Sequence, residues 1–157
     1  MLCCIVTPFK NRFDLFVETF NSLKAQSDKR FEWIIVDDHS SEKEFQKLSE
    51  IAKDFNFIHL LTSKNYGSNA ARNLGLSKAR TNFVVFLDSD DIVGKDFVFN
   101  RIQIIAELQN LDFAVFPVKL FERRINDSQT LWNIKTEEKD LNRFTRVDTP
   151  WHTTSPL

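Results

Sequence analysis

Nine residues, Phe-Val-Val-Phe-Leu-Asp-Ser-Asp-Asp over 83–91, constrain the fold of this chain more than any other stretch. Five consecutive apolar residues that end in a polar cluster predict a strand buried on both faces, because a half-exposed strand would alternate apolar with polar residues. The acidic residues then lie where this buried strand ends. The stretch therefore predicts a covered central sheet with a carboxylate cluster at one strand end.

The acidic cluster itself suggests a metal site. Asp88 and Asp90 are two positions apart, so in an extended chain their carboxylates point to the same side, with Asp91 beside them at the turn. Three carboxylates at one strand end repel one another unless a positive group lies among them. Mg²⁺ or Mn²⁺ fits, since such ions take oxygen ligands and leave positions for water and substrate phosphate. The alternative is a solvated acidic turn that caps the next helix.

Strand and helix patterns alternate along the rest of the chain. Apolar runs predict strands over 2–6, 31–36, 57–61 and 83–87, and a strand-like segment over 113–121 in which Pro117 marks an edge position or a bulge. Helical spacing predicts helices after a cap at Asn11, after a Ser41 and Glu44 capping box, over about 69–80, and after Asp96. This alternation predicts an α/β fold with a mostly parallel central sheet and helices on both faces. Residues 122–147 predict a loop with one short helix.

Composition narrows the class of protein. A chain of 157 residues with 42% hydrophobic composition fits one ordinary domain, and a formal charge of -1 favours neither nucleic acid nor an anionic membrane surface as a partner. No apolar run approaches the roughly 18 residues of a membrane span, so we expect a cytoplasmic protein without a transmembrane segment. The adjacent Cys3 and Cys4 point to opposite faces of a predicted strand and do not suit a disulfide.

Polar residues cluster after each of the first four predicted strands. The clusters span 7–11, 37–40, 65–75 and 88–91. Taken singly, the first two have a structural alternative, because Pro8 and Asn11 can turn the chain and cap a helix, and 37–41 can cap the next one. Ligands of such sheets bind at these strand ends. None of the three glycines forms a phosphate-binding loop, so a phosphate would have to be met by a metal.

As a set, these stretches resemble the family 2 glycosyltransferases with the A-type (GT-A) nucleotide-sugar-binding fold. The resemblance covers residues 1 to about 120 and rests on Thr-Pro-Phe-Lys-Asn at 7–11, Val-Asp-Asp-His-Ser at 36–40, Asn-Tyr-Gly-Ser-Asn-Ala-Ala-Arg-Asn-Leu-Gly at 65–75 and Phe-Leu-Asp-Ser-Asp-Asp at 86–91. It implies that a turn over Thr7, Pro8 and Phe9, together with Asn11, Asp38, Arg72, Asp88 and Ser89, binds the nucleotide sugar. It also implies that Asp88, Asp90 and Asp91 form the site for Mn²⁺ or Mg²⁺. His39 stands where the family often has Gly, and it either contacts the nucleoside or only completes a helix-capping turn.

The resemblance implies metal-assisted, inverting transfer of a sugar from a nucleotide diphosphate, expected to be a UDP-sugar, to a polysaccharide or lipid-linked acceptor. Such an acceptor could bring the protein to a membrane surface peripherally. We expect a donor-binding region over 1–121 and the start of an acceptor-side region over 122–157. The family's general base comes well after the metal motif, and Glu137, Glu138 and Asp140 resemble a solvated helix face more than that base. We therefore expect the base beyond Leu157, in which case this chain is a truncated one.

A second class of function stays open at this point. A naturally short chain without a base would be a non-catalytic nucleotide-sugar-binding domain that serves as a regulatory or assembly partner. The two classes differ in whether an acidic motif follows Leu157 in the gene.

Overall fold

The computed structural model describes residues 2–108, 112–116, 119–120, 129–130 and 144–146. It divides into two compact units, Met1–Ile104 and Ile105–Leu157. Among the residues described, no helix combines the length and the apolar character needed to cross a bilayer.

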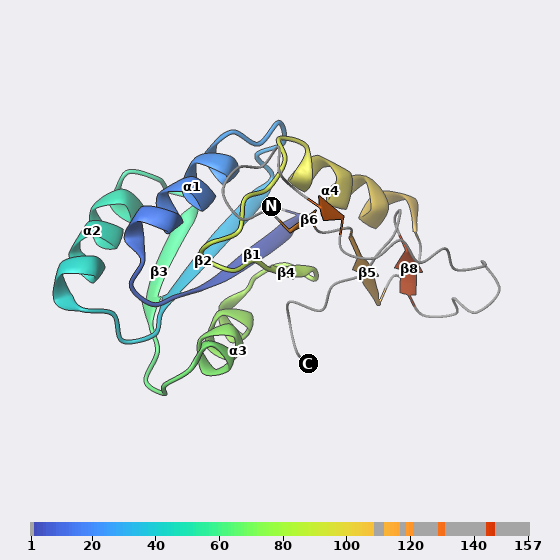
Figure 1. The fold of residues 1–157 in the computed structure, drawn as a ribbon. Helices are drawn as coiled ribbons and strands as arrows, with labels where there is room; N and C mark the ends of the chain where they lie inside the picture. Colours follow the sequence, from blue (N-terminus) through green and yellow to red (C-terminus); the bar gives the residue numbers. More distant parts are fainter. Residues whose placement is uncertain (1, 109–111, 117–118, 121–128, 131–143, 147–157) are drawn as a thin grey trace. The chain divides into compact units, whose positions relative to one another are not determined.

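The first unit is built on a four-stranded parallel sheet (Figure 1). Its strands are β1 Cys3–Phe9, β2 Phe31–Asp37, β3 Ile58–Thr62 and β4 Val84–Phe86, in the order β3-β2-β1-β4. The helices that alternate with them are α1 Phe13–Lys24, α2 Glu42–Lys53 and α3 Ser68–Lys78, and α4 Phe97–Glu107 follows β4. The predicted α/β alternation and the mostly parallel sheet are confirmed.

Two separate apolar clusters cover the two faces of this sheet. On β1, Cys3, Ile5 and Phe9 belong to the cluster beneath α1, α2 and α4, whereas Cys4 and Val6 belong to the cluster beneath α3. Both cysteines are buried and free, so the expectation that they do not form a disulfide is confirmed.

The helix α3 packs very close to the sheet. A Cβ built at Gly75 would lie 2.3 Å from Cγ1 of Val6, so only glycine allows this approach. Helix α3 thereby contacts β1 and β2, and its Arg72 reaches Asp88 after β4.

The strand that precedes the acidic cluster, β4, differs from the predicted one. β4 has only three residues, all half-buried, and among the described strands it forms the edge of the sheet beside β1. The prediction of a strand buried on both faces is met only in part: Val85 packs against the cluster beneath α1, α2 and α4 and Val84 and Phe86 against the cluster beneath α3, but each of the three is only half-buried. β1 and β2, in contrast, are buried throughout and extend to Phe9 and Asp37.

In the second unit, β5 Phe113–Val115 pairs in parallel with β8 Phe144–Arg146, and β6 Lys119–Leu120 pairs antiparallel with β7 Gln129–Thr130. The strand-like segment predicted over 113–121 is thus two short strands, and Pro117 lies outside the described residues. Two short strands also occur within 122–147, where we expected a loop and a helix. The rest of that range, including Glu137, Glu138 and Asp140, lies outside the described residues, and the boundary at residue 121 stays a prediction.

Candidate functional site

The candidate site lies at the carboxyl ends of β1, β2 and β4. The chain runs from β1 to β2 and β3 on one side and then returns to place β4 on the other side of β1. Open α/β sheets bind ligands at such a reversal of strand order, outside the carboxyl ends of the strands. The predicted polar clusters 7–11 and 37–40 include the last residues of β1 and β2, and the clusters 65–75 and 88–91 come after β3 and β4.

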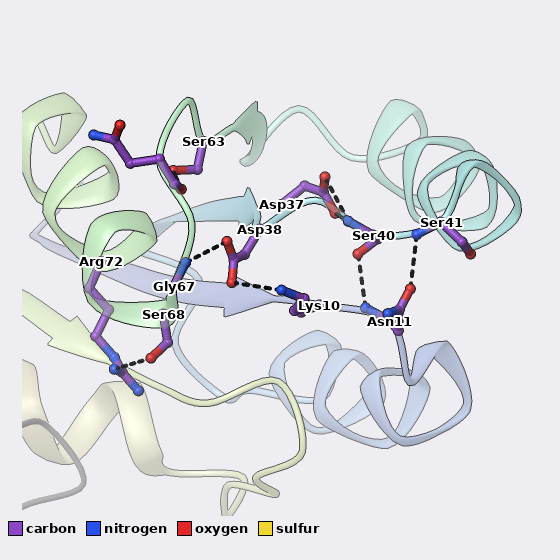
Figure 2. A network of polar contacts seen from close by, with 11 residues as sticks. Lys10, Asn11, Asp37, Asp38, Ser40, Ser41, Ser63, Gly67, Ser68 and Arg72 are labelled. Atoms are coloured by element: carbon purple, nitrogen blue, oxygen red, sulfur yellow. Dashed lines mark hydrogen bonds and ion pairs between the residues drawn. The ribbon is translucent and has the colours of Figure 1, made fainter.

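The loops after β1 and β2 are fastened together by hydrogen bonds (Figure 2). The backbone N–H of Asn11 donates to Oγ of Ser40 at 2.8 Å, and the backbone N–H of Ser41 donates to Oδ1 of Asn11 at 2.9 Å. Asn11 therefore joins the two loops. The sequence suggested that Asn11 caps α1, but the N-cap is Arg12.

A side chain of α2 accepts a hydrogen bond from the first backbone N–H of helix α1. Its N-cap is Arg12, which has a left-handed backbone and no capping side chain. The carboxylate of Glu44 accepts the Phe13 N–H at 2.8 Å, and this bond, with Lys47, lowers the pKa of Glu44. The Ser41 cap of α2 is confirmed, since its Oγ accepts the N–H of Glu44, but the Glu44 carboxylate does not return the bond to Ser41.

Asp37 and Asp38 differ in role although they are adjacent. Asp37 accepts the N–H of Ser40 and closes the turn before α2. Asp38 is buried and joins three segments, since Oδ1 accepts the N–H of Gly67 at 2.8 Å and Oδ2 lies 3.6 Å from Nζ of Lys10 (Figure 2). Gly67 has a φ of 103°, a conformation that favours glycine, so the loop before α3 is shaped to reach Asp38.

An aromatic contact lies next to Asp38. The rings of His39 and Tyr66 stack with centroids 3.8 Å apart and an angle of 16° between their planes. Sequence reasoning left the role of His39 open and assigned none to Tyr66, although both belong to the stretches that carry the family resemblance.

Arg72 and Asp88 form the main ion pair of the site. Nη2 of Arg72 lies 2.5 Å from Oδ1 of Asp88, and Nη1 donates to Oγ of Ser68 and Oδ1 of Asn69 within α3. The Nε of Arg72 is buried and has no hydrogen-bond partner among the described residues. The guanidinium is therefore fixed in place by three hydrogen bonds, and its Nε–H is enclosed by the protein.

The residues 88–91 form a turn and are not extended. The N–H of Asp91 donates to the carbonyl of Asp88 at 3.2 Å, and the carbonyl of Ser89 accepts from Oγ1 of Thr19. The expectation that Asp88 and Asp90 point to the same side of an extended chain is wrong, because the turn rotates the backbone between them. Asp90 instead pairs with Nη1 of Arg12 at 3.4 Å, so two arginines supply the positive charge that three clustered carboxylates need.

The side chains of Thr7 and Phe9 serve the core. Oγ1 of Thr7 accepts the indole N–H of Trp33 at 2.9 Å, and Phe9 packs edge-on against Phe16. The turn predicted over Thr7, Pro8 and Phe9 is the buried end of β1, so the structure does not bring the Thr7 and Phe9 side chains to the site. Apolar strand residues and ligand-binding turns can look alike in sequence, and burial decides between them.

The acidic turn fits a divalent cation in the chemistry of its donors. Asp88 and Asp90 offer only carboxylate oxygens, and their side chains are 33% and 44% exposed, so solvent and ligand can reach them. Across the described residues, no three acidic, His or Cys side chains gather closely enough to hold a metal by themselves. One or two carboxylates with a substrate phosphate is the usual arrangement for Mg²⁺.

This parallel sheet, with a carboxylate-rich turn and an arginine at its carboxyl edge, has the GT-A fold of solved glycosyltransferases. The structure is similar to that of TarS 1-349 from S. aureus in complex with UDP, with a TM-score of 0.62 and 26% identity over 72% of this chain and 36% of that one. It also shares the fold of the mannosyltransferase PcManGT from Pyrobaculum calidifontis, solved with GDP-Man and Mn²⁺, with a TM-score of 0.64 and 20% identity over 73% of this chain and 35% of that one.

The chain belongs to glycosyl transferase family 2, whose model matches residues 4–156. It is 35% identical over 139 residues to the GalNAc(5)-diNAcBac-PP-undecaprenol beta-1,3-glucosyltransferase of Campylobacter jejuni, a match that covers 87% of this chain and 43% of that protein. The chain spans less than half the length of such curated relatives, for example 17% of a glycosyltransferase of Rickettsia felis.

Proposed function

We propose that this chain is the donor-binding part of an enzyme that transfers a sugar from a UDP-sugar to a polysaccharide or lipid-linked acceptor, with metal assistance and inversion. The observation that carries the proposal is the fixed pair of Arg72 and Asp88 beside β1, where the strand order reverses. The similarity to TarS, solved with UDP, and to a glucosyltransferase named for an undecaprenol-linked substrate supports the donor and the acceptor class.

Asp38 is the proposed contact for the nucleoside. Its carboxylate is buried, yet the partner of its Oδ2, Lys10, is half exposed and 3.6 Å away. Because the Lys10 side chain is half exposed, a ligand N–H or hydroxyl that binds Oδ2 in its place lets the ammonium return to water. The other oxygen stays bound to Gly67 and keeps the carboxylate oriented.

The diphosphate is proposed to lie over the acidic turn. Asp88, Asp90 and Asp91 are the candidate residues to hold Mg²⁺ or Mn²⁺, which, when bound together with the diphosphate, offsets the negative charge that develops on the leaving UDP. The Arg12 to Asp90 pair is exposed on both sides and costs little to open. Arg72 keeps Asp88 oriented through their ion pair.

Titration calorimetry with UDP tests this proposal, first with Mn²⁺ and then with excess EDTA. We expect much weaker binding in EDTA, because the diphosphate would otherwise face the carboxylates of Asp88, Asp90 and Asp91 without a cation between them. Equal affinity in the two conditions would refute the metal assignment. If UDP binds in neither condition, the proposal that the donor is a UDP-sugar is wrong.

Two variants separate the proposed roles. Asp90→Asn should remove most of the metal-dependent part of UDP affinity, whereas Asp38→Ala should weaken UDP more than inorganic pyrophosphate. Equal losses for both ligands in both variants would contradict the division between a nucleoside contact and a metal contact.

A further inference from the structure

The stacked rings of His39 and Tyr66 form a rigid aromatic surface beside the buried carboxylate of Asp38. Their centroids are 3.8 Å apart and their planes differ by 16°. His39 comes directly after Asp38, and Tyr66 comes directly before Gly67, whose N–H binds Asp38. The stack is therefore held at fixed distance from that carboxylate through both of its members.

His39 adopts a backbone conformation that is unfavourable for it. Its φ is 59°, and its Nε2 is buried without a hydrogen-bond partner among the described residues. Both features cost stability, and a glycine at this position would avoid them. What the imidazole provides in return is the stack against Tyr66.

Tyr66 presents an aromatic face to solvent. The residue is 75% exposed, although one face of its ring lies on His39. The open face is therefore the one that His39 leaves free. An exposed ring that is also held in orientation is suited to stacking with a planar ligand.

Lys10 lies near both the Asp38 carboxylate and the Tyr66 ring. Its Nζ is 3.6 Å from Oδ2 of Asp38 and 5.7 Å from the centroid of the Tyr66 ring. Half of this side chain is exposed, so its ammonium can move into water when another group takes its place at Asp38. A nucleobase offers the same two interactions, because it has N–H groups for a carboxylate and a π-face for an aromatic ring.

We propose that the nucleobase of the donor stacks on the open face of Tyr66, with His39 as the support behind the ring, and that it displaces Lys10 from Asp38. This inference rests on the proposed function and deepens it, since it assigns Tyr66 and His39 as the residues that select a nucleoside diphosphate over a plain diphosphate. A purely structural stack would stabilise the loop and leave ligand choice unchanged.

Nuclear magnetic resonance tests the contact directly, because Tyr66 is the only tyrosine of the chain. Protein with isotope-labelled tyrosine gives one set of ring signals, to be followed while UDP or inorganic pyrophosphate is added with Mg²⁺, which is diamagnetic. We expect UDP to shift the ring signals through the ring current of uracil and pyrophosphate to leave them nearly unchanged. If calorimetry shows that UDP binds and the signals do not move, this inference is wrong and the proposed function stands. If UDP does not bind at all, both fall together.

Variants distinguish a role of Tyr66 and His39 in binding the nucleobase from a role in stabilising the fold. Tyr66→Ala should weaken UDP binding by about 5- to 150-fold, the range for loss of one base–aromatic stack, and leave pyrophosphate affinity unchanged. Tyr66→Phe keeps the ring and should bind UDP as the wild type does. His39→Gly should keep or raise the melting temperature and still weaken UDP several-fold. Equal losses for UDP and pyrophosphate in Tyr66→Ala, or wild-type UDP affinity in that variant, would overturn the proposal.

Discussion

The pair formed by Arg72 and Asp88 allows a quantitative test of how the site is held together. We consider Arg72→Met, which keeps most of the apolar stem, Asp88→Ala, and the double variant. Arg72 is largely buried and makes one charged contact at 2.5 Å and two hydrogen bonds within α3. The side chain of Asp88 is one-third exposed, so after loss of the arginine its carboxylate can regain water.

These features set the expected magnitudes. Breaking a fully buried ion pair costs about 3–5 kcal/mol, and a hydrogen bond to a charged group contributes about 1.5–3 kcal/mol. Because Asp88 is partly hydrated, we expect Arg72→Met to lower the free energy of unfolding by about 2–4 kcal/mol and Asp88→Ala by about 1–2 kcal/mol. The double variant should lose about 1–2 kcal/mol less than the sum of the two single losses, since the pair can be broken only once.

Equilibrium unfolding in urea, followed by circular dichroism and by tryptophan fluorescence, measures these free energies. Trp33, one of the three tryptophans of the chain, reports on the core of the first unit because it is buried there against Phe16 and Phe20. Additivity of the two substitutions within about 0.5 kcal/mol would show that the contact is not energetically significant. The argument that Arg72 is fixed for ligand binding by Asp88 would then fail.

Two further predictions concern the packing of the first unit. Gly75→Ala should destabilise it by about 1–2 kcal/mol, since overpacking against Val6 outweighs the gain in helix propensity, whereas Gly94→Ala, with nothing within 4 Å of the added Cβ, should have little effect; equal unfolding midpoints in urea would refute this. Burial raises the pKa of Cys3 to about 11 and the pKa of Cys4 to about 12, from 9.0 for an exposed thiol. Between pH 9 and pH 11, both thiols therefore stay protonated in the native state and lose their protons in the unfolded chain. Stability should therefore fall as pH rises above about 9, and a thiol reagent at pH 8 should modify both residues no faster than the chain unfolds; rapid modification of the folded protein would contradict their burial.

Sequence patterns were sufficient to predict the architecture of the first unit. Buried parallel strands leave continuous apolar runs, and helices leave a 3.6-residue period, so each pattern is visible within one segment. The placement of the polar clusters followed from the same reasoning, because the carboxyl ends of parallel strands lie at one edge of the sheet. Within these clusters, the family resemblance singled out Asp38, Arg72 and Asp88 as site residues.

The partners of those residues depended on the tertiary structure. Arg72 and Asp88 are 16 positions apart, and Arg12 and Asp90 are 78 apart, so no local pattern links them. Three other contacts likewise join segments that are far apart in the sequence. They are the hydrogen bond from the Ser41 N–H to Asn11, the hydrogen bond from the Phe13 N–H to Glu44, and the stack of Tyr66 on His39. Thr7 and Phe9 show the reverse case, in which residues of a family motif are directed into the core.

The physical reason for this difference is the range of the interactions. Strand and helix formation depends on neighbours within a few residues and on whether a face is buried, and the amino-acid sequence records both directly. Which carboxylate meets which guanidinium depends on how closely α3 approaches the sheet and on how the chain turns after β4. Those distances are set by packing of the whole first unit, including the contact of Gly75 with Val6, and only the folded chain decides them.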